Sequence, residues 1–340
     1  MRGLVRSATL AGFHEIAQVA DLDAVRLLRD FRLPGRCLWE PEIRIPVESV
    51  RRLLERSAER SGFESFGLMM AEARRMSDLG PLGLLVREQP TLRLALEACA
   101  RHANRLNEAL HLTLEEEGEL VVVREELLFG RAGPARQSTE LAIGVIFRTL
   151  SHFLGADWRP RRVCFTHDAP SDRSVHHRVF GVQVEFGSAF NGIVCSRADL
   201  DRSNPRADPG IARLARQWLE SNVAPSESEV TAHVRHHIVQ LLSAGRCNVV
   251  SVAARLGIDR RTVHRRLLAE GHTFTELATA VKKELAARYL EDQQRRFADV
   301  AELLGFASSS GFSRWHRTHF RETATARRAR VAEARRRGKK

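Results

Sequence analysis

Apolar residues in the first part of the chain recur with the spacing of α-helices. Residues 47–58 place apolar side chains three and four positions apart after Pro46, and residues 92–106 repeat that pattern after Thr91. Pro46 suits a first helical turn and Thr91 suits an N-cap. Both segments are therefore predicted to be helices with one buried face.

The spacing then changes to that of strands. Residues 110–114 alternate apolar and polar side chains, residues 116–118 supply a turn, and residues 120–123 are apolar, which predicts a β-hairpin. The pattern further predicts a helix over about 139–154 and strands at 162–166, 182–186 and 193–196. Helices followed by strands indicate an α+β domain that ends near residue 200.

Two stretches rich in turn residues follow, at 201–210 (DRSNPRADPG) and 221–228 (SNVAPSES), with a helical pattern between them. Beyond them the chain has helical spacing throughout. We therefore expect four parts: an α+β domain at 1–200, a linker region with a short helix at 201–228, an all-α domain at 229–330 and a basic tail at 331–340.

The all-α part contains an internal repeat. The run VAARLG at 252–257 returns in outline as VAELLG at 300–305, 48 residues later. An Ala four residues before a Gly suits a helix-turn-helix, because Ala lets two helices cross closely and Gly adopts a turn that a Cβ would strain. Val263 then supplies the apolar contact of the second helix, and Asp259 is placed to cap it. The pattern predicts two helix-turn-helix units.

The second helix of the first unit has two distinct faces. Val263 and Leu267 face inward, and Arg261, His264 and Arg265 share the opposite face. An arginine can bond O6 and N7 of guanine together, as reading of the major groove requires. The flanking Arg260 and Arg266 are placed to meet phosphates. The alternative is an ordinary solvated basic face.

The second unit repeats this division. One stripe holds Phe312, His316 and Phe320, and a second, basic stripe holds Arg314, Arg317 and Arg321, with Ser309 and Ser310 at the helix start. Between the units, Thr273 and Glu276 form a capping box that opens a helix over 274–290, about 25 Å long at ~1.5 Å per residue. A spacer of that size could hold two helices in successive major grooves, which are ~34 Å apart.

Three segments, VAARLGIDRRTVHRRLLAEGHTFTEL, ELAARYL and VAELLGFASSSGFSRWHRTHF, resemble the AraC/XylS family of bacterial transcription regulators over about residues 230–330. The resemblance implies base contacts by the following residues: Arg261, His264, Arg265, Ser309, Ser310, Ser313 and Arg314. Residues 66–106 are similar to the effector domains of one AraC subgroup, which sense a small molecule or mediate self-association. The resemblance also implies activation through RNA polymerase and a homodimer.

The chain departs from the family pattern at three positions. Arg321 and Ala324 stand where the family usually has Gly and Pro, and His316 stands where an aromatic core residue is usual. We expect a second unit that is less stable, or one that contacts mainly the DNA backbone. The family's sugar-binding members use a β-barrel sensor, and the few strands predicted here do not favour arabinose binding.

The charge distribution supports a polyanionic partner. Of the net charge of +12, residues 248–340 carry +11, from 17 Arg and 4 Lys against 10 acidic residues. Charge confined to one domain is typical of nucleic-acid binding. An anionic membrane surface is the rival partner, but only Trp315 offers an aromatic anchor there. The terminal run RRARVAEARRRGKK either extends a helix along phosphates or remains a solubilising tail.

Other chemistry finds little support in the sequence. Five cysteines without a Cys-x-x-Cys pair argue against a disulfide framework or zinc cluster and fit a reducing cytoplasm. No apolar run is long enough to span a membrane, and no secretory signal is expected. His233, His236 and His237 place two imidazoles four residues apart with no third ligand, so no metal site is expected.

No phosphate-binding loop or Gly-x-Ser-x-Gly motif occurs. The expected protein is therefore a cytoplasmic, sequence-specific DNA-binding transcription regulator, not an enzyme, and needs no cofactor. Two alternatives stay open. One is a small-molecule enzyme domain tethered to a basic nucleic-acid-binding domain, and the other is an architectural protein that binds DNA by shape. Residues that bind an effector are not identified by the sequence.

Overall fold

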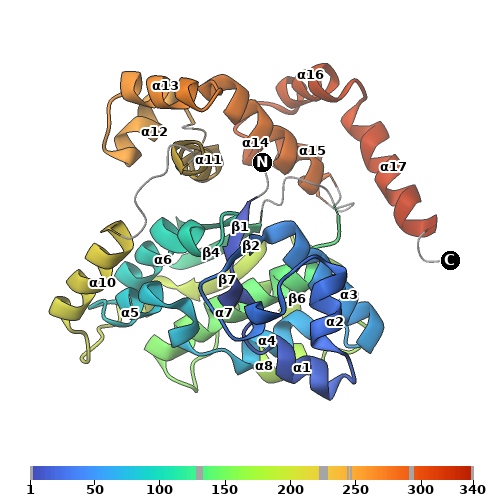
Figure 1. The fold of residues 1–340 in the computed structure, drawn as a ribbon. Coiled ribbons are helices and arrows are strands. Elements are labelled where there is room, and N and C mark those ends of the chain that lie inside the picture. Colours follow the sequence, from blue (N-terminus) through green and yellow to red (C-terminus); the bar gives the residue numbers. More distant parts are fainter. Residues whose placement is uncertain are drawn as a thin grey trace. The chain divides into compact units, whose positions relative to one another are not determined.

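The computed structural model describes residues 3–127, 133–221, 229–242, 245, 247–290 and 295–337. The chain forms two compact units, Met1–Ala224 and Pro225–Lys340. Figure 1 shows strands and helices in the first unit and helices in the second. The expected fold class, an α+β domain followed by an all-α domain, is confirmed.

A five-stranded sheet organises the first unit. Its order is β3-β4-β7-β5-β6, and all neighbours are antiparallel except β5 and β6. The strands are β3 (Leu110–Glu117), β4 (Leu120–Leu127), β5 (Arg162–Cys164), β6 (Val184–Glu185) and β7 (Asn191–Ser196). The predicted hairpin is confirmed as β3 and β4, which turn at Gly118 with a φ of 60°. A separate pair, β1 (Leu4–Arg6) and β2 (Arg44–Pro46), lies near the start of the chain.

The helices of the first unit pack their apolar faces inward. The predicted helices are present as α3 (Val47–Ser61), α6 (Leu92–Leu106) and α7 (Arg136–Leu154), and the Thr91 hydroxyl caps α6 by accepting from the Leu94 amide at 3.3 Å. The remaining helices are α1 (Phe13–Val19), α2 (Ala24–Asp30), α4 (Phe66–Ala73), α5 (Pro81–Arg87), α8 (Ser174–Phe180), α9 (Arg197–Leu200) and α10 (Pro209–Ser221), with short 3-10 turns η1 (Ser7–Leu10), η2 (Gly35–Leu38) and η3 (Met76–Leu79). Helix α6 packs along β3, and α7 packs against β4 and β7.

Helices α4 and α7 approach each other very closely. A Cβ added at Gly67 would lie 2.0 Å from the Gln137 carbonyl oxygen, and one added at Gly144 would lie 2.4 Å from the Ala71 Cβ. The Gly67 amide also donates to Gln137 Oε1 at 2.8 Å. Glycine is therefore required on both helices for this crossing, since real Cβ atoms do not approach so near.

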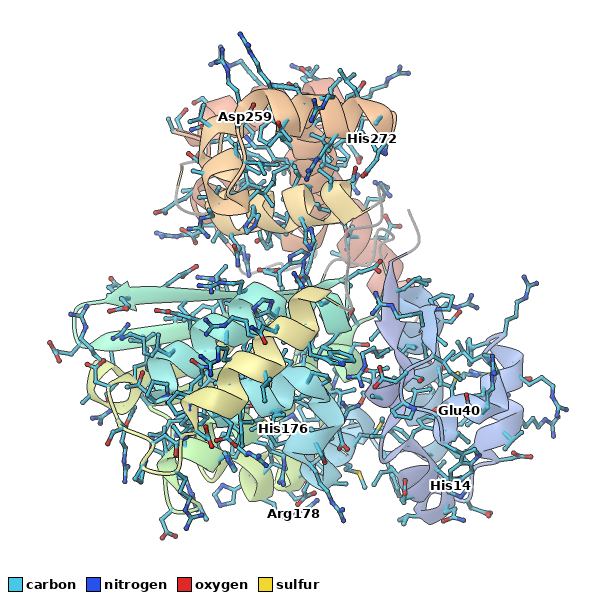
Figure 2. The ribbon with its side chains drawn as sticks, turned by 60° about the vertical axis from the view of Figure 1, so that its left-hand side comes forward. His14, Glu40, His176, Arg178, Asp259 and His272 are labelled. Atoms are coloured by element: carbon cyan, nitrogen blue, oxygen red, sulfur yellow. The ribbon has the colours of Figure 1, made fainter. Side chains whose placement is uncertain are left out.

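A buried polar cluster ties α7 to α8. Glu140 is fully buried, and its Oε1 accepts from Arg136 Nε at 2.9 Å and lies 3.2 Å from His176 Nε2 and 3.5 Å from His167 Nε2. Burial alone would raise the pKa of Glu140. The hydrogen bond to His176 and the nearby positive charges outweigh it and hold that pKa below its usual range. His176 is labelled in Figure 2, within the first unit.

The stretch expected as a linker region contains the helix α10, which packs against α5. Asp208, just before α10, donates its amide to Glu88 at 2.9 Å. Ala215 and Leu219 are buried on this side, whereas Leu214 and Trp218 are exposed. Residues 222–228 lie outside the described part of the chain, and the sequence-based domain boundaries stay predictions.

The second unit consists of helices in its described residues: α11 (Glu229–Leu242), α12 (Val249–Leu256), α13 (Arg260–Ala269), α14 (Phe274–Tyr289), α15 (Phe297–Leu303), α16 (Ser309–Phe320) and α17 (Ala324–Arg337). Figure 1 shows α14 between the pair α12–α13 and the pair α15–α16. Helix α17 continues through Arg337, so the backbone of the predicted tail is helical up to that residue. Residues 338–340 lie outside the described part.

Candidate DNA-binding site

The first helix-turn-helix is formed by α12 and α13. Asn248 caps α12 by accepting from the Ser251 amide at 2.9 Å, and α12 ends at Gly257, whose φ of 66° lies in the left-handed region. Asp259 then caps α13 by accepting from the amides of Arg261 and Thr262 at 2.8 and 3.0 Å. The predicted turn glycine and N-cap are both confirmed.

Helix α13 buries one side and exposes the other. Val263 and Leu267 are fully buried. All five basic residues of α13 that were predicted to contact DNA are exposed: Arg260, Arg261, His264, Arg265 and Arg266. Within the described chain, none of their side chains forms an ion pair or a hydrogen bond. Figure 2 labels Asp259 at the start of α13 and His272 just beyond its end, and nitrogen-tipped side chains extend outward there.

Helix α11 packs against the first helix-turn-helix. Val234 and Ile238 are fully buried, and α11 packs against α12, α13 and α14. Arg235 forms an ion pair with Glu284 of α14, and Gln240 accepts from Arg255 of α12 at 3.1 Å. Helix α11 thus holds α12 and α14 through polar contacts and meets α13 by packing, and none of these polar contacts uses the exposed basic side chains of α13.

Helix α14 joins the two helix-turn-helix units. The predicted capping box is confirmed, since Thr273 accepts from the Glu276 amide and Glu276 accepts from the Thr273 amide at 2.9 Å. With 16 residues, α14 is about 24 Å long. Lys282 Nζ lies 4.5 Å from the centre of the Phe306 ring, and Lys283 Nζ lies 5.6 Å from that of Phe320. Both lysines therefore contact the second helix-turn-helix by cation–π interactions.

The second helix-turn-helix is formed by α15 and α16, with Gly305 between them at a φ of 70°. Ser308 caps α16 by accepting from the Gly311 amide at 3.2 Å, so Ser309 and Ser310 occupy the first helical turn. The sequence interpretation placed serines at this helix start but missed Ser308 as the cap. The N-cap preference for Ser could have identified it.

The predicted DNA-contacting residues of α16 lie at its surface. Ser310, Ser313, Arg314 and Arg317 are exposed, and Ser309 is half-buried. In the described residues the guanidinium groups of Arg314 and Arg317 have no ion-pair partner. The two predicted sets thus lie on two separate helices joined by α14, not in one cluster.

His316 fills a buried position in the core of the second helix-turn-helix. Its ring is stacked on Phe320, with centroids 4.4 Å apart, and packs edge-on to Phe312 at 5.7 Å. Its Nδ1 donates to the Glu322 carbonyl oxygen at 3.0 Å. Burial lowers the pKa of His316 below its usual value. A neutral imidazole therefore replaces the usual aromatic ring and adds a hydrogen bond.

The lowered pKa of His316 predicts that the stability of the second helix-turn-helix falls at acid pH. The unfolded chain takes up a proton at His316 below about pH 6.5, whereas the folded chain resists it. The contribution of neutral His316 to the free energy of unfolding is therefore complete above about pH 6.5. It is lost as the pH falls, at most about 1.4 kcal/mol per pH unit. We expect hydrogen exchange of the α16 amides to speed up between pH 7 and 5, after correction for intrinsic rates, and His316→Phe to reduce this effect. His319→Phe on the same helix is the control. Equal pH dependence in wild type and His316→Phe would contradict the assignment.

Arg321 ends α16 in a conformation that normally belongs to glycine. Its φ is 58° and its ψ is 20°, in the left-handed region, which a Cβ strains. Ala324 is buried and is the first residue of α17, a position that suits proline. The two family departures therefore fall at a helix end and a helix start. This local geometry explains why Gly and Pro are usual there.

Replacing Arg321 by glycine is expected to stabilise the second helix-turn-helix by about 1 kcal/mol. The left-handed backbone strain that glycine relieves costs more free energy than the greater flexibility of glycine in the unfolded chain. Arg321→Ala, which removes the side chain but keeps the Cβ, is the matched control and should not stabilise. Hydrogen exchange of the α16 amides measures both. A gain in Arg321→Ala as large as that in Arg321→Gly would mean that side-chain repulsion, not backbone strain, limits stability.

The described residues offer no metal site and no membrane-spanning helix. No group of three or more His, Cys, Asp and Glu side chains is positioned to hold a metal ion among them. His237 Nδ1 lies 3.2 Å from Gln240 Oε1, and burial lowers the pKa of His237 to about 4. The side chain of His236 lies outside the described part. None of the described helices is both long and apolar enough to cross a bilayer.

Comparisons with known proteins cover both units. Residues 22–204 match the family described as the arabinose-binding domain of AraC transcription regulators, and residues 252–330 match a helix-turn-helix domain. The HTH-type transcriptional regulator VirS of Mycobacterium tuberculosis is 28% identical over 323 residues, which cover 93% of this chain and 94% of VirS. The ornithine utilization regulator of Pseudomonas aeruginosa is 25% identical over 287 residues, covering 83% and 84%.

A solved structure is also similar, the transcriptional regulator CdpR of Pseudomonas aeruginosa. It is 21% identical, with a TM-score of 0.46, over 93% of this chain and 96% of CdpR. The family match to the N-terminal unit spans more than half of the chain, and the C-terminal unit carries the matched helix-turn-helix domain. The chain therefore belongs to the AraC family of transcription regulators, with a DNA-binding helix-turn-helix domain at its C-terminal end.

Proposed function

We propose that α13 and α16 read base pairs in successive major-groove segments, and that a small molecule bound by the first unit controls this binding. The observation that carries the proposal is the exposed face of α13. Four arginines and a histidine stand there without partners in the described chain, while the reverse side is buried. Side chains that need no internal partner are available to DNA.

We assign the DNA contacts of α13 to two kinds. Arg261, His264 and Arg265 are assigned to base edges, because they are at helical spacing on one face. Arg260 and Arg266 flank that face and are assigned to phosphates. On α16 we assign base or backbone contacts to the following residues: Ser309, Ser310, Ser313, Arg314 and Arg317.

Membership of the family supports a wider regulatory role as part of the proposal. In this proposal the protein acts in the cytoplasm as a homodimer, responds to an effector and activates transcription by positioning RNA polymerase beside its site. The matched relatives are named as transcriptional regulators, which favours this function over an enzyme domain tethered to DNA.

Selection of bound sequences from random DNA tests the proposal. The full-length protein is mixed with the DNA pool at near-physiological salt and with excess nonspecific competitor, because phosphate contacts alone are strongly salt-dependent. Two enriched blocks about one helical turn apart, ~10 base pairs, are expected. One block would mean that α16 contacts only the backbone. No enriched sequence, with and without cell extract as a source of effector, would overturn sequence-specific reading.

A further inference from the structure

The first unit contains an apolar cavity between its sheet and helices α3, α6 and α7. One wall is a single face of the hairpin, where Leu110, Leu112 and Leu114 alternate along β3 and Leu114 pairs with Val123 of β4. The helices contribute mostly Leu, Val and Ala. Apolar cavities with a few converging polar groups are typical of small-molecule sites.

Two buried arginines lie among the few polar residues that line the cavity. Arg6 and Arg74 are each only 8% exposed. Arg6 Nη1 lies 3.5 Å from the Asp78 carbonyl oxygen, and Arg74 Nη2 donates to the Thr9 carbonyl oxygen. Arg6, Arg74, Thr9 and Asp78 all line the cavity, so four of its polar residues lie together, and Asn107, Ser138 and Thr149 line it as well.

The two arginines differ in their partners. Arg6 forms an ion pair with Glu42, with Nε donating to Oε2 at 2.9 Å. Arg74 has no ion-pair partner among the described residues, and its Nε has no hydrogen-bond partner there. Asp78 is the nearby acid, but it is partly exposed and its carboxylate accepts from the Arg75 amide at 2.9 Å.

Arg74 is therefore a buried cation whose hydrogen bonds are only partly satisfied. Burial lowers its pKa to about 10, so it keeps its charge near neutral pH. A buried charge without a counter-ion costs free energy, and a carboxylate that accepts from its guanidinium would recover it. An apolar wall beside such a cation favours a ligand with one anionic group and an apolar body.

We propose that this cavity binds a small carboxylate whose alkyl or aryl body packs against the aliphatic walls and whose carboxylate is held by Arg74. The inference rests on the proposed function, in which the first unit is the effector domain, and it names the class of effector. It differs from what the description of the matched domain suggests. A monosaccharide carries a hydroxyl on nearly every carbon, and mostly aliphatic walls would leave these without partners at a cost for each.

The test is a binding titration of the full-length protein by calorimetry. The probes are straight-chain carboxylates from butyrate to tetradecanoate and phenyl-substituted alkanoates, with the methyl esters, the matching alcohols and arabinose as comparators. We expect the best carboxylate to bind at least about 10-fold more tightly than its ester or alcohol, because charge-assisted hydrogen bonds are worth about 1.5–3 kcal/mol.

Arg74→Met should weaken binding of that carboxylate by about 10- to 100-fold and leave the weaker affinity for its alcohol largely unchanged. Arg75→Met, at the exposed neighbour, is the matched control and should bind as the wild type does. If Arg74→Met does not fold, Ala142→Phe tests the site instead, because Ala142 lines the cavity and a larger ring should block every probe.

Equal affinity for acid and ester would overturn the role of the carboxylate, and binding of arabinose in preference to every acid would overturn the ligand class. Failure of all the acids to bind at millimolar concentration would overturn the proposal as a whole. These outcomes are separate from those of the DNA selection. Enriched DNA blocks without carboxylate binding would leave sequence reading intact and remove only the effector class.

Discussion

Replacing Arg261 by alanine is expected to weaken binding to the selected DNA site by about 10- to 100-fold, while binding to random DNA changes little. Arg261 lies in the first turn of α13, exposed and without a side-chain partner in the described chain. A bidentate contact to guanine contributes about 1–3 kcal/mol of discrimination, which its loss removes at one base-pair position. Competition titrations with single-base variants of the selected site, at one fixed salt concentration, measure the change.

Arg266→Ala is the matched control on the same helix. A phosphate contact carries no sequence information, so its loss should weaken selected and random DNA alike. It should also reduce the slope of affinity against salt by ~0.9 for the one contact removed. If Arg314→Ala instead relaxes the base preference more than Arg261→Ala, the roles of α13 and α16 are reversed.

Replacing Gly67 by alanine is expected to destabilise the first unit by about 3 kcal/mol or more. The new Cβ would lie 2.0 Å from the Gln137 carbonyl oxygen and 2.8 Å from its carbon, both in the backbone of α7. Neither helix can rotate a backbone atom away, so α4 and α7 must separate and lose their packing. Urea unfolding of the full-length protein, followed by circular dichroism, should show an earlier transition.

Gly35→Ala is the control for the general effect of adding a methyl group to glycine. Its Cβ would lie 3.8 Å from Val25 Cγ1, an ordinary contact, and a change within about 1 kcal/mol is expected. Similar midpoints for Gly67→Ala and Gly35→Ala would show that the crossing of α4 and α7 adapts cheaply. Because α7 also lines the cavity, Gly67→Ala should weaken carboxylate binding too.

Local signals in the sequence predicted much of the DNA-binding unit. Asp259 as an N-cap, Gly257 as a left-handed turn residue and the capping box of Thr273 and Glu276 are all present in the structure. Each depends on residues within a few positions of one another, so no knowledge of distant contacts was needed. The division of α13 into buried and exposed faces followed from spacing alone.

Contacts that depend on the path of the chain beyond a single helix were not predicted. The sequence placed His316 on an apolar stripe, but its hydrogen bond to the Glu322 carbonyl depends on how the chain turns after α16. The left-handed geometry of Arg321 belongs to that same turn. Helix α10 packs on α5, and Ala215 and Leu219 are buried. Leu214 and Trp218 on the same helix stay exposed. Periodicity identifies a face but not what covers it.

The sequence by itself determined the fold class, the tandem helix-turn-helix units and the basic face of α13, because each is encoded by local spacing, capping and charge. Only the tertiary structure decided how β3 and β4 meet α3, α6 and α7 around a cavity, and that Arg74 stands at its wall with no ion-pair partner among the described residues. Arg6, Arg74 and the hairpin are separated by tens of residues along the chain. Their meeting depends on packing and strand register, which no single segment specifies.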